Sequence, residues 1–225
     1  MKLKEFVKSH SFVYKCVYPF FKTYISMVEK DFLRKSVKIY NRGTAVLEKS
    51  FCGKKNSIYI GRCSVLNHTA IRIRGNNNCL KIGDNVYVGK GCSFWMEGNN
   101  LSITIGDNTT FTHSVHFCAQ ENNVCIEVGK DCMFSNNIII RTSDSHPIYA
   151  LGSDQRLNPA ASVKIGNHVW IAPHSTIMKN ADIENGAIIG SNTLINKHVP
   201  QNVLAVGAPM KIVKENIYWT RESLF

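Results

Sequence analysis

The chain has 225 residues, of which 44% are hydrophobic, and a formal net charge of +11. This length suits one domain with short appendages, and the absence of any run of about 18 apolar residues excludes a membrane-spanning helix. Lys8, Lys15 and Lys22 interrupt the apolar core that a signal peptide would need, so we expect a cytoplasmic protein.

Residues 1–50 differ from the rest of the chain and predict a helical segment, because apolar residues recur there every three or four positions. Pro19 predicts either a kink in this segment or two helices, of which the second begins near the proline. It holds 11 basic and 4 acidic residues, a surplus of 7, whereas residues 51–225 hold 16 and 12, a surplus of 4. Two interpretations stay open: the segment caps the domain that follows, or residues 1–40 rest on the anionic inner face of a membrane.

A loose repeat begins at residue 53 and predicts stacked coils. Four copies end in Gly61, Gly83, Gly106 and Gly129, which are 22, 23 and 23 residues apart. Three of the copies begin with a Gly-Lys-Lys or Gly-Asn-Asn turn, and Gly and Asn tolerate the left-handed backbone conformation. We therefore expect these turns to stack as a ridge along one corner of the coils.

Eight cysteines are spread over the chain without a Cys-x-x-Cys pair. Cys92 and Cys132 occupy the small-residue position of a six-residue unit, which predicts thiols that act as small core hydrophobes. We expect no metal site.

The longest break in the repeat is the segment 141–162, which begins Arg-Thr-Ser-Asp-Ser-His-Pro. A long loop that leaves a regular scaffold is a frequent place for functional residues. The segment therefore predicts a protruding functional loop.

From residue 165 the chain reads in sixes, with isoleucine at positions 165, 171, 177, 183, 189 and 195. A period of six fits neither a helix nor an ordinary strand, and it is typical of a solenoid with three short faces per coil. We predict an all-β solenoid, a parallel β-helix, over residues 51–200. Residues 201–225 are predicted to form a C-terminal tail or short helix.

This run resembles the hexapeptide-repeat acyltransferases, and most of all the maltose, galactoside and capsular-polysaccharide (sialic acid type) O-acetyltransferases. The similar motifs are Asp144-Ser-His-Pro-Ile-Tyr149, Val163 to Ala172, and Val206-Gly-Ala-Pro-Met-Lys-Ile-Val213. The resemblance implies a left-handed β-helix and a homotrimer. It also implies transfer of an acetyl group from acetyl-CoA to a sugar hydroxyl, within a ternary complex.

O-acetyl transfer needs a base, and histidine suits that task because it titrates near neutral pH. Among eight histidines, His146 begins the long loop and matches the base of the resembling family. Asp144 lies two residues earlier, so on an extended backbone its carboxylate would share a face with the imidazole and orient it. A role in starting a turn is the alternative for Asp144.

The acceptor side is predicted from Trp170, which the resemblance places in the acceptor or pantetheine region, and from Arg141, Arg156 and Tyr149 of the loop. The two arginines would hold acceptor oxygens, or else be solvated surface residues.

The resemblance places the acetyl-CoA donor against Ala172, Ser191, Asn196 and Lys197, with Lys211 and Lys214 at its phosphates. Where the family carries an asparagine near the thioester oxygen, this chain has Ala119 followed by Gln120. Oxyanion stabilisation would then come from a backbone N–H or from Gln120.

We thus expect an O-acetyltransferase of a surface polysaccharide (capsule or lipopolysaccharide) or its precursor, with a carbohydrate acceptor and no nucleic-acid partner. A sugar N-acetyltransferase is one alternative, because the same base and groove would serve an amine. A catalytically silent scaffold is another. A zinc carbonic anhydrase fits poorly, since His113 and His116 do not match the spacing that its three histidines need. The sequence does not identify the sugar or the hydroxyl.

Overall fold

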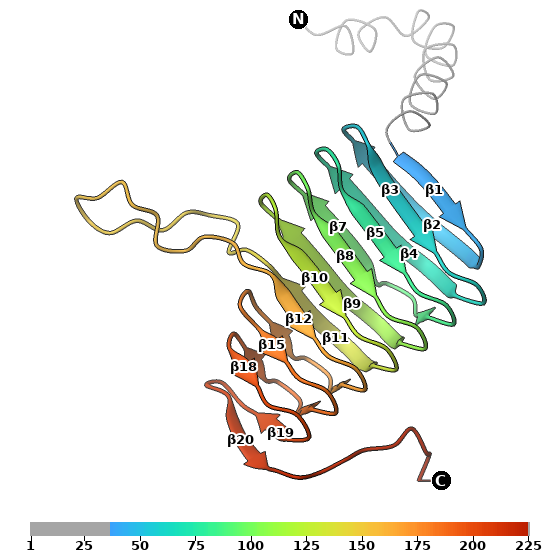
Figure 1. Ribbon diagram of the computed structural model, residues 1–225, viewed down its shortest axis with the longest axis vertical. Coiled ribbons are helices and arrows are strands. Elements are labelled where there is room, and N and C mark those ends of the chain that lie inside the picture. Colours follow the sequence, from blue (N-terminus) through green and yellow to red (C-terminus); the bar gives the residue numbers. More distant parts are fainter. Residues whose placement is uncertain (1–36, 225) are drawn as a thin grey trace, which may run out of the picture.

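A computed structural model describes residues 37–224, which form an all-β solenoid of parallel strands (Figure 1). One face of the coils is an 8-stranded sheet. Its strands are β1 (Val37–Asn41), β3 (Asn56–Ile60), β5 (Cys79–Ile82), β8 (Ser102–Ile105), β10 (Cys125–Val128), β12 (Val163–Ile165), β15 (Asp182–Ile183) and β18 (His198–Val199). Among residues 37–224, no helix is long and apolar enough to span a bilayer.

The 12-stranded sheet wraps round the other two faces of the coils. Its strands are β2 (Thr44–Cys52), β4 (Val65–Arg74), β6 (Tyr87–Val88), β7 (Ser93–Glu97), β9 (Thr110–Gln120), β11 (Met133–Arg141), β13 (Trp170–Ile171), β14 (Thr176–Ile177), β16 (Ile188–Ile189), β17 (Leu194–Ile195), β19 (Leu204–Val206) and β20 (Lys211–Lys214). Long strands such as β9 and β11 turn the corner between the two faces, since β11 pairs first with β13 and then with β14.

The strand pairing confirms the predicted three six-residue units per coil in the C-terminal half. The strand partners are Ile165 with Ile183, Ile171 with Ile189, and Ile177 with Ile195. Partners 18 residues apart in the sequence therefore stack one coil apart, and each of these isoleucines is buried. Like stacks on like because every coil presents the same residue type at the same position.

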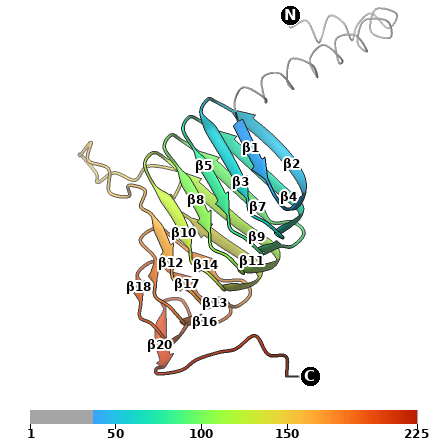
Figure 2. The same cartoon turned by 45° about the vertical axis from the view of Figure 1, so that its right-hand side comes forward.

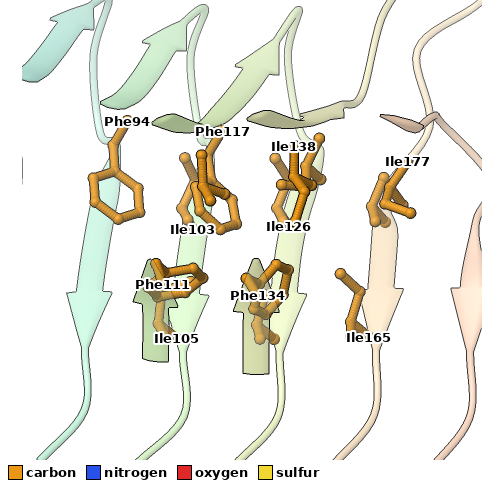
Figure 3. Packing of buried hydrophobic residues seen from close by; sticks show 14 of the residues in the cluster. Phe94, Ile103, Ile105, Phe111, Phe117, Ile126, Phe134, Ile138, Ile165 and Ile177 are labelled. Carbon is orange, nitrogen blue, oxygen red and sulfur yellow. The ribbon is translucent and has the colours of Figure 1, made fainter. Parts of the chain in front are cut away.

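Aromatic side chains fill the wider coils of the first half (Figure 3). Phe94 stacks on Phe117 with 5.0 Å between ring centroids, and Phe111 lies 4.7 Å from Phe134. All four rings are fully buried. Their burial removes large apolar surfaces from water, which is the main source of stability for the solenoid.

The asparagine turns stack as the repeat predicts. Along this corner the backbone N–H of Asn76 donates to Asn99, and that of Asn99 donates to Asn122, at 2.9 and 2.8 Å. The following residues form a second ladder and adopt positive φ angles: Asn77, Asn100 and Asn123. The ridge is confirmed, and its hydrogen bonds satisfy polar groups that would otherwise interrupt the coils.

The solenoid begins earlier than residue 51, which corrects the predicted boundary. Residues 37–50 were assigned to a helical segment, but β1 pairs in parallel register with β3 from Val37↔Asn56 to Asn41↔Ile60. β2 pairs with β4 in the same way. The reason is that an added coil covers the edge of β3, whose backbone groups would otherwise be unpaired. The predicted helix over residues 1–36 lies outside the described residues.

The C-terminal end also extends beyond residue 200. β19 pairs in parallel with β16, and β20 then runs antiparallel to β19. The antiparallel strand turns the chain back on itself and covers that edge of the sheet. Residues 215–224 form a tail without helix, so the tail interpretation holds and the short helix does not.

Candidate active site

The long loop comprises residues 142–162, between β11 and β12. It projects from the coils in both views of the molecule (Figures 1 and 2). A single antiparallel bridge joins Tyr149 to Arg156, and the N–H of Leu157 donates to the carbonyl of Ile148 at 2.8 Å. The loop is thus a two-stranded arm, and the segment around His146 lies at its base.

An ion pair anchors the arm to the coil below it. The guanidinium of Arg156 donates to both carboxylate oxygens of Glu121, at 2.6 and 2.7 Å, and Ser143 Oγ donates to the same carboxylate at 2.6 Å. The hydrogen bonds from Arg156 hold the pKa of Glu121 below its usual range, with a further contribution from Ser143. Arg156 was predicted to hold acceptor oxygens, but its guanidinium is paired with Glu121 and anchors the loop to the coil.

Asn158 is the centre of the loop's hydrogen bonds. Its side-chain oxygen accepts from the N–H of Ile148 at 2.7 Å, and its Nδ2 donates to the carbonyl of His146 at 2.9 Å. These two backbone groups lie on either side of Pro147, so one buried amide fixes the backbone that carries His146. The same Nδ2 also donates to Asp144 Oδ2 at 2.9 Å.

Asp144 contacts a lysine rather than the predicted histidine. Lys179 Nζ, from the turn after β14, donates to Asp144 Oδ2 at 2.6 Å and to the carbonyl of Asn158 at 3.1 Å. The hydrogen bond from Lys179, and after it the one from Asn158, lowers the pKa of Asp144. Among the described residues no hydrogen bond joins Asp144 to His146. The prediction that Asp144 orients the imidazole is therefore corrected: its short bonds to Lys179 and Asn158 make it an anchor of the loop.

His146 is exposed and follows a residue with a left-handed backbone. Ser145 has φ +67°, a strained value for a residue with a side chain. Ser145 Oγ accepts from Arg141 at 2.6 Å and donates to Gln120 Oε1 at 2.9 Å. Arg141, Gln120 and His146 are therefore gathered at the base of the loop, whereas Ala119 is fully buried in the core.

Trp170 lies at another side of the coil. It pairs with Met133 at the start of β11, whereas His146 follows the end of that strand. Its ring meets Trp219 of the C-terminal tail at 6.0 Å between centroids, and Trp219 stacks on His168 at 4.1 Å. Trp219 Nε1 also donates to the carbonyl of His168 at 2.9 Å. Within the single chain Trp170 thus does not lie beside His146, although the prediction placed both in one site.

The predicted donor residues occupy two corners. The N–H of Ala172 donates to Ile189 O at 2.8 Å and its carbonyl accepts from Ser175 Oγ, so its backbone groups have partners within the coils. Ser191 is exposed one coil further along the same corner. Asn196 and Lys197 are exposed at the next corner, directly after the strand that pairs with β14.

Lys211 and Lys214 are exposed at the two ends of β20, on the last turn of the chain before the tail. Tyr149 is 51% exposed on the arm. Together with Lys197, these two lysines give the last coils three exposed ammonium groups, where an anionic donor would find positive charge.

Four residues with clear roles in this geometry were not predicted: Glu121, Asn158, Lys179 and Trp219. Lys179 occupies an ordinary position of the repeat, so the sequence offers no signal for it. Glu121 stands where the three earlier copies of the repeat begin with glycine, and this departure from the pattern is the signal that the sequence offers for it. Asn158 precedes Pro159, a common turn pair, and Trp219 is a large aromatic residue in an otherwise polar tail. Of these four residues, only the tail tryptophan has a residue type that predicts packing against the domain.

Comparisons with known proteins agree with this architecture. Residues 162–197 match the family model described as bacterial transferase hexapeptide (six repeats). A polysialic acid O-acetyltransferase of Neisseria meningitidis is 38% identical over 181 residues, which cover 80% of this chain and 82% of the relative. A polysialic acid O-acetyltransferase of Escherichia coli O1:K1 is 36% identical over 83 residues, and this match spans 37% of the present chain and 27% of that relative.

The solved structure of the polysialic acid O-acetyltransferase OatWY superposes with a TM-score of 0.75 and 35% identity, over 84% of this chain and 89% of that one. The chain belongs to the hexapeptide-repeat acetyltransferase family, together with the polysialic acid O-acetyltransferases.

Proposed function

We propose that the protein transfers the acetyl group of acetyl-CoA to a hydroxyl of an acidic capsular glycan such as polysialic acid, or of its precursor. The observation that carries the proposal is the anchored loop, which holds the backbone of His146 between Asn158 and the Ser145–Gln120 contact. Relatives that share four fifths of this chain are named as acetyltransferases of polysialic acid, and this supports the substrate class.

In the proposed reaction His146 takes the proton of the acceptor hydroxyl as its oxygen attacks the thioester carbonyl. A C–O bond forms and the carbonyl electrons move to oxygen. When the tetrahedral intermediate collapses, the C–S bond breaks and the CoA thiolate takes the proton back from the imidazolium. The transfer is direct, so no acetyl-enzyme forms. An exposed histidine on a fixed backbone suits this exchange of a proton with two substrates.

Gln120 is the side chain that we assign to the developing oxyanion. Its Oε1 accepts from Ser145, and its backbone N–H is bound by Thr142 Oγ1 at 2.9 Å. Its side-chain NH₂ is therefore the group that remains to donate toward the reacting carbonyl, next to the residue that precedes His146. A preorganised amide donor of this kind stabilises negative charge more than water does.

The donor would lie along the last coils, with Lys197, Lys211 and Lys214 near its phosphates. The three side chains are exposed and belong to neighbouring turns of the chain. Their ammonium groups would attract CoA phosphates as point charges, and salt would weaken this attraction.

A homotrimer would complete the site. Four apolar residues on the arm are between 51% and 105% exposed: Ile148, Tyr149, Leu151 and Leu157. Such a cluster is typical of a subunit contact. In a trimer the side of one copy that bears Trp170 would face the loop of the next copy. Left-handed winding of the coils is part of the same proposal, and light scattering that found an active monomer would refute the trimer.

Membrane contact through residues 1–40 falls mainly outside the described chain and stays a prediction, as does the location at the cytoplasmic face. The basic surplus of residues 1–50 and the helical spacing of their apolar residues support it. Sedimentation of the full-length protein with anionic vesicles would test it.

The proposed function is tested by release of CoA thiol, measured with polysialic acid and with a neutral glycan. We expect His146→Ala to lower turnover by at least about 100-fold, which is a usual contribution of a general base. The melting temperature should stay the same, because His146 is exposed on a loop. His113→Ala is the matched control, since His113 is exposed on β9, and it should keep full activity. Near-normal turnover of His146→Ala would overturn the assignment.

A further inference from the structure

A second concave surface lies on the first half of the solenoid, away from the loop. It is a cavity of about 380 Å³ on the outer side of β4, β7 and β9. Arg72, Ser93, Trp95 and His116 point outward from these strands and line it, together with Glu48 and His68. None of these residues has a part in the proposed reaction.

The lining combines an aromatic ring, a cation and hydroxyl-binding groups. Ser93 Oγ and His116 Nδ1 are 2.8 Å apart, and burial lowers the pKa of His116, so its imidazole is neutral at neutral pH. Arg72 is exposed, and within residues 37–224 it has no carboxylate partner, whereas the adjacent Arg74 pairs with Glu97 at 3.4 Å. A planar guanidinium without a partner suits a carboxylate ligand.

Strand register connects this cavity to the catalytic loop. Arg72 pairs with Trp95, Trp95 with Cys118, and Cys118 with Arg141, so the four side chains form one row along the solenoid axis. Three steps between strands span about 15 Å. The row ends at Arg141, which donates to Ser145 beside His146. A glycan chain that lies along this row would reach both places.

We propose that the cavity is a remote subsite for the acceptor, which binds a carboxylate-bearing sugar several residues away from the sugar that is acetylated. Arg72 pairs with the carboxylate, the ring of Trp95 packs on an apolar sugar face, and Ser93 and His116 bond hydroxyls. Glu48 pairs with Ala70 in the strand register and therefore lies beside the row that contains Arg72, where it accepts hydrogen bonds from sugar hydroxyls. This inference rests on the proposed function, and it makes an acidic polymer, rather than a single sugar, the preferred acceptor.

The test is titration of polysialic acid into the full-length His146→Ala protein, which binds without turnover. We expect Arg72→Gln and Trp95→Ala each to weaken polymer binding by about tenfold or more, as truncation of a residue at the centre of a binding interface does. Arg72→Lys should lie between, because the charge stays and the paired N–H donors are lost. Binding of monomeric sialic acid and of acetyl-CoA should not change, since both contact the loop and the last coils.

Two matched controls separate specific contact from long-range attraction. Arg62→Gln removes the same charge from a side chain 73% exposed beside Asp84, and Tyr87→Ala removes an exposed aromatic ring from another face. Both should bind the polymer as the parent does. Equal weakening by Arg62→Gln and Arg72→Gln would refute the subsite, because steering by net charge would explain it. Unchanged polymer binding by Arg72→Gln and Trp95→Ala would also refute the subsite. It would likewise be refuted if these two variants lost acetyl-CoA binding instead of polymer binding.

Kinetics of the active protein distinguish this inference from the function on which it rests. Arg72→Gln should raise KM for the polymer by about tenfold and leave kcat unchanged, the pattern of a lost binding contact. If the parent binds the polymer through the cavity but releases no thiol with it, the proposed function fails and the subsite stands. If the parent acetylates the polymer and the Arg72→Gln protein does so with the same KM, the subsite fails alone.

Discussion

Asn158→Ala should disable catalysis without unfolding the solenoid, because its side chain holds the loop and not the coils. It makes three short hydrogen bonds: 2.7 Å to the N–H of Ile148, 2.9 Å to the carbonyl of His146 and 2.9 Å to Asp144. Each bond contributes a net free energy of about 0.5–1.5 kcal/mol, so the change should destabilise the ordered conformation of the loop by about 2–4 kcal/mol. The side chain is only 8% exposed, so water replaces these bonds poorly.

A loss of about 2 kcal/mol in the ordered state of the loop corresponds to at least about a 30-fold fall in kcat. Thiol release at saturating substrate measures this fall, and thermal melting measures the solenoid. The melting temperature should change little, since the loop lies outside the stacked coils. Asn158→Asp should not rescue activity, because it keeps the acceptor for Ile148 but puts a carboxylate against Asp144.

Gln155→Ala is the matched control for Asn158→Ala. Gln155 is an exposed amide on the same arm, and its one hydrogen bond within residues 37–224 runs from the backbone N–H to Ser153 Oγ at 3.0 Å. Its loss should leave kcat as in the parent. The reasoning would be refuted if Asn158→Ala kept parental kcat. A large fall in melting temperature together with kcat would refute it as well, because Asn158 would then support the coils.

Two further predictions concern acid and the donor. The lowered pKa of Glu121 means that its ion pair with Arg156 contributes fully above the unfolded carboxyl pKa of about 4.3 and is lost as pH falls through the folded value. Amide NMR signals of the loop should therefore broaden only in acid, and Glu121→Gln should show the same broadening at neutral pH. Signals that change neither with pH nor with this substitution would contradict the anchoring role of Glu121. Replacing Lys211 and Lys214 together by glutamine should raise KM for acetyl-CoA and leave kcat largely intact, and a loss confined to kcat would place these lysines elsewhere.

The repeat was predictable because the same residue type recurs at each contact. Ile165 predicts a buried partner at Ile183 without any knowledge of the fold, since the period itself names the partner one coil away. The asparagine ridge was predictable for the same reason. The proposed base was predictable from its motif, because a protruding loop interrupts the repeat at Asp144-Ser-His146.

The start of the solenoid was harder to predict. Residues 37–41 follow a segment of helical periodicity and carry no copy of the glycine pattern. Their strand structure comes from β3, whose exposed edge offers parallel pairing to any chain of suitable direction. The boundary therefore depends on a neighbour in space and not on a local pattern.

The sequence by itself thus determined the stacked coils, the family and the loop that carries His146. Only the tertiary structure decided which partner each charged residue takes. Arg156 pairs with Glu121, 35 residues away in the sequence, and Lys179 pairs with Asp144 at the same separation. Trp219 bonds the carbonyl of His168, which lies 51 residues earlier. These pairs follow no period, because the loop and the tail leave the repeat and meet whichever coil lies beside them in space.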